Sequence, residues 1–139
     1  MWSWIKIPIE LYKSKFTIID MKNEKILHAD DSFIARDGFK SLIEAYGSED
    51  EHELIGQAAS KEEVEQLIEE GLQPTVAFID NKMPHEGDGE KAAQIIRKLS
   101  PETIIISLSA DTDVTFGDHN LTKKMAGQEL IDFITSIKH

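Results

Sequence analysis

From residue 25 onward, short apolar runs alternate with segments whose apolar residues recur at helical spacing. The apolar runs lie at 25–29, 54–58, 75–79 and 103–108, and the helical stripes at 35–46, 60–68, 92–99 and 130–137. Strands that alternate with helices in this way form a parallel sheet covered by helices on both faces. The sequence therefore predicts a doubly wound α/β domain.

Length and charge narrow the class of protein further. A chain of 139 residues suits one compact domain with a substantial core. Its 26 Asp and Glu residues outnumber its 15 Lys and Arg residues, and the net charge of −11 repels phosphate backbones, so we expect no nucleic-acid partner. The absence of cysteine excludes disulfides and a cysteine nucleophile. No apolar run approaches membrane-spanning length and the first residues do not form a secretory signal, so we expect a cytoplasmic protein without a membrane partner.

The first 24 residues form an N-terminal extension ahead of the domain predicted at 25–139. Residues 16–20 suit a strand that turns back at 22–24 into the first strand of the domain. Residues 2–12 equally suit a short amphipathic helix interrupted at Pro8, and both alternatives remain open. The predicted closing helix reaches the end of the sequence, so we expect no output domain in this polypeptide.

Polar side chains stand where the predicted strands end. Asp30 and Asp31 follow the first strand, Asp80 ends the third, Ser109 follows the fourth, and Lys123 precedes the closing helix. Doubly wound sheets bind ligands beyond the carboxyl ends of their strands. If the first and third strands are neighbours, three carboxylates converge, and their repulsion must be offset by a hard cation or by shared protons. Mg²⁺ suits such a cluster, because it prefers oxygen ligands and retains several waters.

These residue types together predict a phosphoryl-transfer site. A carboxylate can act as a nucleophile and form an acyl phosphate, while a cation, a hydroxyl and an ammonium stabilise the transferred oxygens. Asp80 is the natural nucleophile and Asp31 a direct metal ligand. Asp30 would act through metal-bound water, and the backbone carbonyl of Lys82 could complete the coordination sphere. A lone Asp at a strand end is usually a turn former, so the prediction depends on the whole set.

Four segments resemble the bacterial response-regulator receiver domains of two-component signalling. Residues 26–32, Ile-Leu-His-Ala-Asp-Asp-Ser, resemble the opening of that domain. Residues 76–84, Val-Ala-Phe-Ile-Asp-Asn-Lys-Met-Pro, with the Gly-Asp-Gly of 87–89, look like its phosphoacceptor segment. Residues 104–110 resemble the strand that ends in the switch hydroxyl, and Lys123 resembles the site lysine.

This resemblance implies a flavodoxin-like, five-stranded parallel sheet of order 2-1-3-4-5. It also implies that Asp80 is the phosphoacceptor, with Ser109 and Lys123 in the catalytic site and Mg²⁺ as the cofactor. The implied phosphodonor is a histidine kinase or a histidine phosphotransfer protein of a phosphorelay, and acetyl phosphate could substitute for it. The protein would then be no enzyme beyond accepting and slowly losing its own phosphoryl group. Its output would be contact with a downstream protein that the sequence does not identify.

The chain departs from the family pattern around the last strand. Lys124 stands where the family has a proline after the lysine, which puts the usual cis peptide in doubt. Only 13 residues, 110–122, separate Ser109 from Lys123, too few for a helix and a strand with their loops, so the fourth helix must be missing or reduced. Asn120 takes the aromatic switch position. We interpret Phe116 as a core residue that replaces lost helix contacts rather than as a relocated switch.

The loop after the acceptor differs as well. Residues 84–89 hold one residue more than the family turn, so we expect a bulge there. Lys82 stands two residues after Asp80, and Asp111 two residues after Ser109. The Lys82 and Asp111 side chains either form an ion pair over the phosphate that slows hydrolysis or remain two exposed, unpaired groups.

Two other interpretations compete with a working receiver. The first is a pseudo-receiver, an interaction module that no longer switches on phosphorylation, and the reduced helix and Asn120 favour it. The second is a Mg²⁺-dependent phosphatase of the haloacid dehalogenase type, but that chemistry needs a second Asp where Lys82 stands. The five histidines show no ligand spacing, so we interpret them as surface or loop residues, with His28 partly buried in the first strand.

Overall fold

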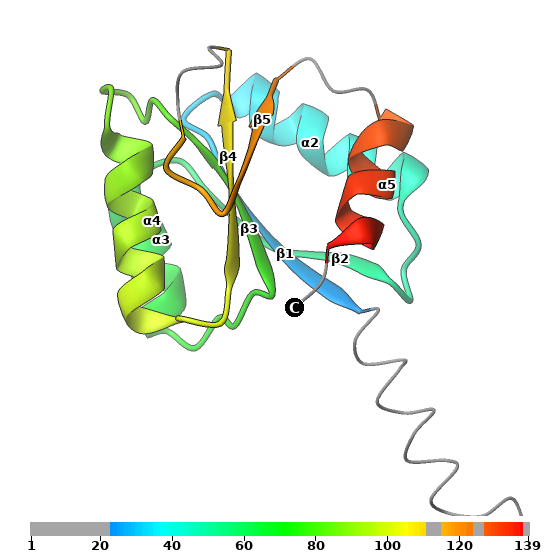
Figure 1. Ribbon diagram of the computed structural model, residues 1–139, viewed down its shortest axis with the longest axis horizontal. Coiled ribbons are helices and arrows are strands. Elements are labelled where there is room, and N and C mark those ends of the chain that lie inside the picture. The colour runs from blue at the N-terminus through cyan, green and yellow to red at the C-terminus, as the bar shows by residue number, and fades with distance from the viewer. Residues whose placement is uncertain (1–22, 111–114, 124–126, 138–139) are drawn as a thin grey trace, which may run out of the picture.

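The computed structural model describes residues 23–110, 115–123 and 127–137 (Figure 1). These ranges contain five strands and four helices. In chain order they are β1 (Glu24–Ala29), α2 (Phe33–Tyr46), β2 (His52–Ala58), α3 (Lys61–Glu69), β3 (Val76–Asp80), α4 (Asp88–Leu99), β4 (Ile104–Ser109), β5 (His119–Thr122) and α5 (Gly127–Ser136). The alternatives for residues 1–22 lie outside the described residues, and β1 begins one residue earlier than predicted.

The five strands form one parallel sheet in the order β2-β1-β3-β4-β5. This order confirms the predicted doubly wound, flavodoxin-like sheet. Helices α2 and α5 cover one face and α3 and α4 cover the other (Figure 1). Because β1 lies directly beside β3, the residues that follow these two strands meet at the same edge of the sheet.

The period of two along each strand divides the core between the two faces. In β3, Val76 and Phe78 pack on the α2 and α5 side, whereas Ala77 and Ile79 pack on the α3 and α4 side. All four side chains are fully buried. A strand buried on both faces is apolar throughout, which is why β3 reads as a continuous apolar run. Each large side chain buried in this way contributes roughly 1.5–3 kcal/mol to folding.

Side-chain caps fix where the helices begin at the carboxyl edge of the sheet. The Ser32 hydroxyl accepts a hydrogen bond from Ala35 N at 3.2 Å at the start of α2. The Ser60 hydroxyl accepts one from Glu63 N at 3.1 Å, and the Glu63 carboxylate accepts one from Ala59 N at 2.8 Å. Ser60 and Glu63 thus form a variant of the capping box, in which the carboxylate bonds the residue before the N-cap.

The connection between β4 and β5 is short. Its described residues, 110 and 115–118, contain no helix, which confirms for this part of the chain that the fourth helix is missing or reduced. Phe116 packs against the core on the α3 and α4 side, as expected for a residue that replaces helix contacts. Gly117 crosses so close to β4 that a Cβ there would lie 2.6 Å from Ser107 N.

Some predicted surface and core positions were wrong. His52 is buried rather than a surface residue: Nδ1 accepts a hydrogen bond from Ser48 N at 3.1 Å, and Nε2 lies 3.3 Å from Thr135 Oγ1. Tyr46 and Leu99, placed on the inner helical stripes, are instead 53% and 40% exposed, each as the last residue of its helix.

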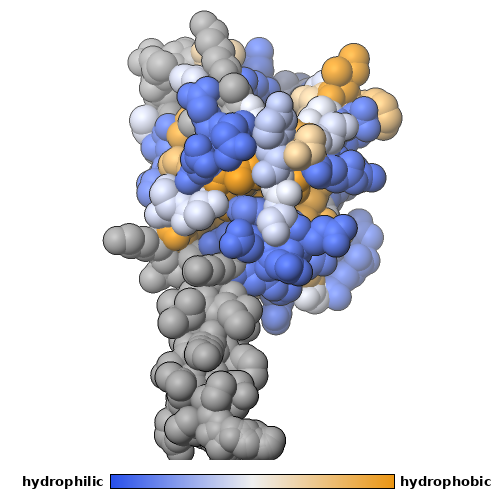
Figure 2. Space-filling model, turned by 90° about the vertical axis from the view of Figure 1, so that its right-hand side faces the viewer, coloured by the Kyte–Doolittle hydropathy of each residue, from blue (hydrophilic) through white to orange (hydrophobic). Residues whose placement is uncertain are grey.

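The surface of the described residues is mainly polar. The side of the molecule that carries α5 is largely hydrophilic, with smaller apolar areas between the polar ones (Figure 2). The exposed large apolar side chains are those of Phe33, Ile34, Tyr46 and Leu99. Among the residues that the structure describes, no helix combines the length and the apolar character needed to cross a membrane.

Candidate functional site

Three carboxylates converge at the carboxyl edge of the sheet. Asp80 is the last residue of β3, and Asp30 and Asp31 directly follow β1. One carboxylate oxygen from each of the three lies within 4.8 Å of the others. Asp30 and Asp80 are buried, whereas Asp31 is exposed. The structure thus brings together the cluster that the strand ends predicted.

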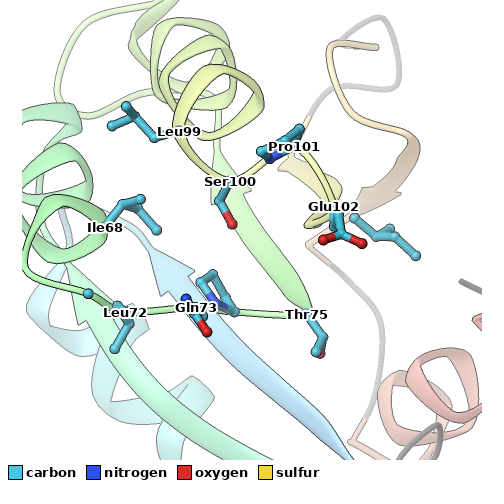
Figure 3. A pocket seen from close by; sticks show the side chains of 11 residues that line it. Ile68, Leu72, Gln73, Thr75, Leu99, Ser100, Pro101 and Glu102 are labelled. Atoms are coloured by element: carbon cyan, nitrogen blue, oxygen red, sulfur yellow. The ribbon is translucent and has the colours of Figure 1, made fainter.

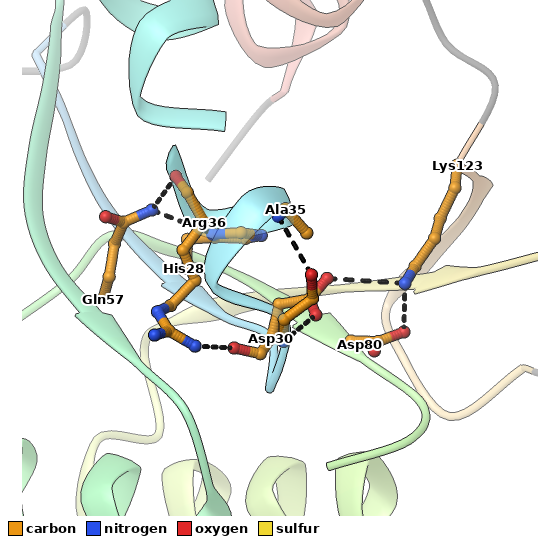
Figure 4. A network of polar contacts seen from close by, with 8 residues as sticks. His28, Asp30, Ala35, Arg36, Gln57, Asp80 and Lys123 are labelled. Atoms are coloured by element: carbon orange, nitrogen blue, oxygen red, sulfur yellow. Dashed lines mark hydrogen bonds and ion pairs between the residues drawn. The ribbon is translucent and has the colours of Figure 1, made fainter. Parts of the chain in front are cut away.

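The ammonium of Lys123 lies inside this cluster (Figure 4). Its Nζ is 2.9 Å from Asp80 Oδ1 and 3.4 Å from Asp30 Oδ2. Lys123 follows β5, and its backbone N donates to Ser109 O at 3.0 Å, which ties it to the end of β4. The contacts agree with the choice of Lys123 as the site lysine, while Lys124 and its peptide bond lie outside the described residues.

Burial and crowding of charge shift the two partners of this ion pair. Burial raises the pKa of Asp80 above its ordinary value, the Lys123 ammonium opposes that shift, and the neighbouring Asp30 charge adds to it. Burial lowers the pKa of Lys123, but the hydrogen bond to Asp80 and the two carboxylate charges outweigh it, so that this pKa is raised. The Lys123 ammonium thus pairs with two of the three carboxylates of the cluster.

Asp30 is fixed at every polar atom that it has. Its backbone N donates to Ala58 O at 2.9 Å, and its backbone O accepts from Arg36 Nη1 at 2.8 Å. In its carboxylate, Oδ1 accepts from Ser32 N at 2.9 Å, and Oδ2 faces Lys123. A group bonded at each atom in this way is held in one place, so the position of the Asp30 carboxylate is set before any ligand arrives.

The other predicted site residues lie at the same edge. Ser109 is the buried last residue of β4, paired with Thr122 of β5. Lys82 is exposed in the loop after β3, where it forms an isolated bridge with Glu86. The role of the Lys82 carbonyl as a metal ligand remains a prediction. The proposed Lys82–Asp111 ion pair lies outside the described residues.

Two glycines shape the loop between Asp80 and α4. A Cβ on Gly89 would lie 2.2 Å from Asp80 O, so only glycine permits this close approach, and Gly89 N donates to Asn81 O at 3.0 Å. Gly87 has φ +88, the left-handed region that glycine adopts without strain. The Met83–Pro84 peptide is cis. The turn at 84–89, which is one residue longer than the family turn, thus contains the left-handed Gly87. Gly89 at its end packs against the backbone of Asp80 in β3.

Asp88 is a functional-site neighbour that the sequence argument missed. It is buried, its Oδ2 accepts from His85 N at 3.1 Å, and its Oδ1 lies 3.2 Å from Lys61 Nζ. The hydrogen bond from the His85 backbone, with help from Lys61, holds the pKa of Asp88 below its ordinary value. Asp88 therefore ties the acceptor loop to the start of α3. Its only sequence signal was an acidic residue between two glycines, shortly before the helical stripe predicted at 92–99.

A separate hollow of about 810 Å³ lies at the opposite edge of the sheet (Figure 3). Its lining residues include Thr75, which directly precedes β3, and Ile104, the first residue of β4, together with Leu72 and Leu99. The carboxylate cluster stands at the other ends of these strands. The hollow is therefore not part of the candidate site.

Residues 26–135 match the family model of the response regulator receiver domain. The chain belongs to the response-regulator receiver family. Receiver domains act in two-component signalling, receive phosphoryl groups from partners such as histidine kinases, and are in general not enzymes in their own right. The acidic pocket of receiver domains binds Mg²⁺, and this chain has an acidic cluster of Asp30, Asp31 and Asp80.

The chain is also similar to a curated protein and to several solved structures. An uncharacterized transcriptional regulatory protein of Bacillus subtilis (strain 168), YhcZ, is 34% identical over 89 residues, which cover 64% of this receiver and 39% of YhcZ. The chain thus spans about two-fifths of the curated relative that it matches. Among solved structures, the response regulator domain of Thermotoga maritima CheB has a TM-score of 0.65 at 22% identity and covers 84% of this chain and 99% of that one.

The isolated receiver domain of RcsB from Salmonella enterica serovar Typhimurium has a similar likeness. Its TM-score is 0.65 at 21% identity, with coverage of 79% of this chain and 84% of that one. A LuxR-family response regulator from Aurantimonas sp. SI85-9A1 has a TM-score of 0.66 at 22% identity, with coverage of 79% and 81%. Identities this low show that the fold is shared and say nothing further about function.

Proposed function

We propose that this receiver accepts a phosphoryl group on Asp80 from the phosphohistidine of a histidine kinase or a phosphotransfer protein, with Mg²⁺ bound beside it. The observation that carries the proposal is the ion pair of 2.9 Å between Lys123 Nζ and Asp80 Oδ1 within a cluster of three carboxylates. The buried strand-end carboxylate supplies the nucleophile, and the ammonium paired with it supplies positive charge that stabilises the transferred oxygens.

The reaction is a displacement at phosphorus. A carboxylate oxygen of Asp80 attacks the phosphorus atom, a P–O bond forms, and the P–N bond to the donor imidazole breaks. The imidazole leaves with the electron pair and takes up a proton, and Asp80 becomes an acyl phosphate. In this proposal Lys123, which pairs with Asp80, neutralises charge on the transferred oxygens, and Ser109, buried at the end of β4, donates a hydrogen bond to them.

The residues present fit a divalent cation. Asp30, Asp31 and Asp80 offer carboxylate oxygens within 4.8 Å of one another, and hard oxygen ligands are what Mg²⁺ prefers. We assign Asp31 and Asp80 as direct ligands, Asp30 as a ligand through water, and the Lys82 carbonyl as a further ligand. When bound, Mg²⁺ supplies charge neutralisation for the transferred group. Asp31 is exposed, so a hydrated ion would have access to the cluster from the solvent side.

Output through contact with a downstream protein is part of the proposal, and a pseudo-receiver that no longer switches is the second candidate. The observation that favours the second is the bonding of Asn120 at the switch position. Its Oδ1 accepts from Gly117 N at 3.1 Å and from the Ser107 hydroxyl, which ties this strand to its neighbour. Both candidate functions include phosphoryl capture on Asp80. They differ in whether the β4–β5 connection changes conformation when Asp80 is phosphorylated.

Acetyl phosphate with Mg²⁺ tests the capture step. Intact mass should show one phosphate adduct on the wild type and on Asp37→Asn, an exposed control on α2, and none on Asp80→Asn. With EDTA present from the start, the wild type and Asp37→Asn should form no adduct. A wild type that shows neither the adduct nor Mg²⁺ binding would reject the proposal.

A second measurement separates the two candidates. The isolated RcsB receiver was solved with the phosphomimetic BeF₃⁻, and the same probe suits Asp80 here. Amide exchange in β4, β5 and their connection should slow on adding Mg²⁺ and BeF₃⁻ if the domain switches. Binding of the probe without a change in this region would favour the pseudo-receiver.

A further inference from the structure

Gln57 lies beneath α2, one strand away from the carboxylate cluster (Figure 4). It is the register partner of His28 across the β1–β2 pair. Its Nε2 donates to the backbone O of Arg36 at 2.8 Å and lies 3.1 Å from His28 Nδ1. Because a carbonyl oxygen only accepts, the amide nitrogen must point toward Arg36, and its second N–H then faces His28 Nδ1.

Arg36 continues the connection from Gln57 to the cluster. Gln57 holds the backbone of Arg36, and the Arg36 side chain reaches back to donate from Nη1 to Asp30 O at 2.8 Å. The guanidinium also lies 5.8 Å from the centre of the Phe33 ring, which keeps it beside the start of α2. Three elements, β2, α2 and the end of β1, are thereby joined by side chain to backbone hydrogen bonds.

The inner end of this connection packs against buried aromatic rings. His28 is buried, and its ring stacks on Phe39 with the centroids 4.0 Å apart and an angle of 9° between the planes. Phe39 in turn lies 5.3 Å from the ring of Phe78 in the centre of the sheet. Gln57 is therefore anchored against a packed aromatic cluster rather than against a mobile surface group.

We propose that Gln57 and Arg36 are positioning residues that hold the Asp30–Asp31 turn against the repulsion of the carboxylate cluster and so set its affinity for Mg²⁺. The inference rests on the proposed function of the cluster. Three carboxylates at this distance push the turn away from Asp80 when no cation is bound. The hydrogen bond from Arg36 Nη1 to Asp30 O opposes that movement, because it holds the first residue of the turn. Outer contacts of this kind typically change metal affinity 10- to 100-fold when they are removed.

Gln57→Met is the decisive variant because it changes no charge. Methionine keeps the length of the side chain but donates no hydrogen bond, so long-range electrostatics of the cluster stay the same. We expect the dissociation constant for Mn²⁺, measured by electron paramagnetic resonance with Mg²⁺ as competitor, to rise about tenfold. Gln66→Met is the matched control, because the Gln66 amide donates to Glu70 within α3, away from the cluster.

A double-mutant cycle with Arg36→Met tests whether the two residues act as one unit. The loss of the Arg36 charge by itself favours cation binding. The cycle compares the effect of Gln57→Met in the wild type with its effect in Arg36→Met, so this contribution of the charge cancels. If Gln57 acts through Arg36, adding Gln57→Met to Arg36→Met should change the affinity less than twofold. Full additivity of the two changes would overturn the proposed connection.

Amide exchange in EDTA provides a readout that does not depend on metal. Gln57→Met should speed exchange across residues 28–36, whereas Gln66→Met should leave it unchanged. Far-UV circular dichroism and melting confirm folding, and Gln57→Leu replaces the Met variant if that one fails to fold. Wild-type exchange and wild-type affinity in a folded Gln57 variant would overturn the inference. If the wild type binds no divalent ion, the proposed function fails, and the exchange result alone then decides whether Gln57 positions the turn.

Discussion

The carboxylate cluster and the β4–β5 connection lie at neighbouring places on one sheet but are built differently. At the cluster, Asp30 is bonded at every polar atom, and Lys123 contacts two carboxylates. In the connection, the described residues hold no helix, Phe116 fills part of the core, and Asp118 bonds to the backbone of β4 through its Oδ2. Under the proposed function, phosphoryl capture depends on the first region and transmission on the second, so a substitution should be able to remove one property and keep the other.

The largest expected effect comes from Lys123→Ala, which strips the cluster of its ammonium. We expect the rate of phosphorylation by acetyl phosphate to fall by roughly 10²–10³, the usual loss when one donor to a developing charge is removed. Mg²⁺ affinity should rise at the same time, because Lys123 Nζ no longer competes for Asp80 Oδ1. Lys91→Ala, an exposed change on α4 that removes the same charge, should alter neither quantity. Parallel losses of rate and of Mg²⁺ affinity would show that Lys123 only supports the structure.

The sheet and the convergence of the three carboxylates were both predicted from the sequence. Alternating apolar runs predicted the sheet, because buried parallel strands and amphipathic helices have distinct periods. Once β1 and β3 are neighbours, strand-end positions alone bring Asp30, Asp31 and Asp80 together. The resemblance to receivers then identified Lys123 among two adjacent lysines.

Other contacts could not be predicted, because they depend on register and on the path of the backbone. Gln57 meets His28 only through the β1–β2 register, which shifts between Ile26 and Leu27. The His52 ring in β2 contacts the hydroxyl of Thr135 in α5, although the two residues are 83 positions apart in the sequence. Gly89 is required because α4 begins in contact with the backbone of Asp80, and sequence spacing does not reveal such a contact.

The second-largest expected effect is on the pH dependence of stability, and it should come from His28 near the carboxylate cluster rather than from His119 in the β4–β5 region. Burial lowers the pKa of His28 to about 4, so the histidine is neutral in the folded protein at pH 7. In the unfolded chain its pKa is about 6.5, so the unfolded state binds more protons between these values. The free energy of unfolding should therefore fall as pH drops from about 6.5 to about 4, by roughly 3 kcal/mol in total from this residue.

Urea unfolding in EDTA at several pH values measures this effect without metal. His28→Phe keeps a ring against Phe39 but cannot take up a proton, so its stability should depend less on pH between 4 and 6.5. His119→Phe is the matched control, because His119 is exposed in β5 beside the rebuilt connection. Equal pH dependence in the wild type and His28→Phe would show that burial of His28 does not link protonation to folding.

The smallest expected effect tests what Phe116 does in the connection. Its side chain is partly buried against the core on the α4 side, so Phe116→Ala should reduce the free energy of unfolding by about 2 kcal/mol, less than the 3–5 typical of a fully buried Phe. Phe133→Ala is the matched control, because Phe133 is also partly buried but packs on the opposite face. If Phe116 is only a core residue, both variants lose stability, and both phosphorylate at the wild-type rate below their melting temperatures. A change in the BeF₃⁻-induced protection of β5 in Phe116→Ala alone would instead make Phe116 a relocated switch, and capture and transmission would then share a residue.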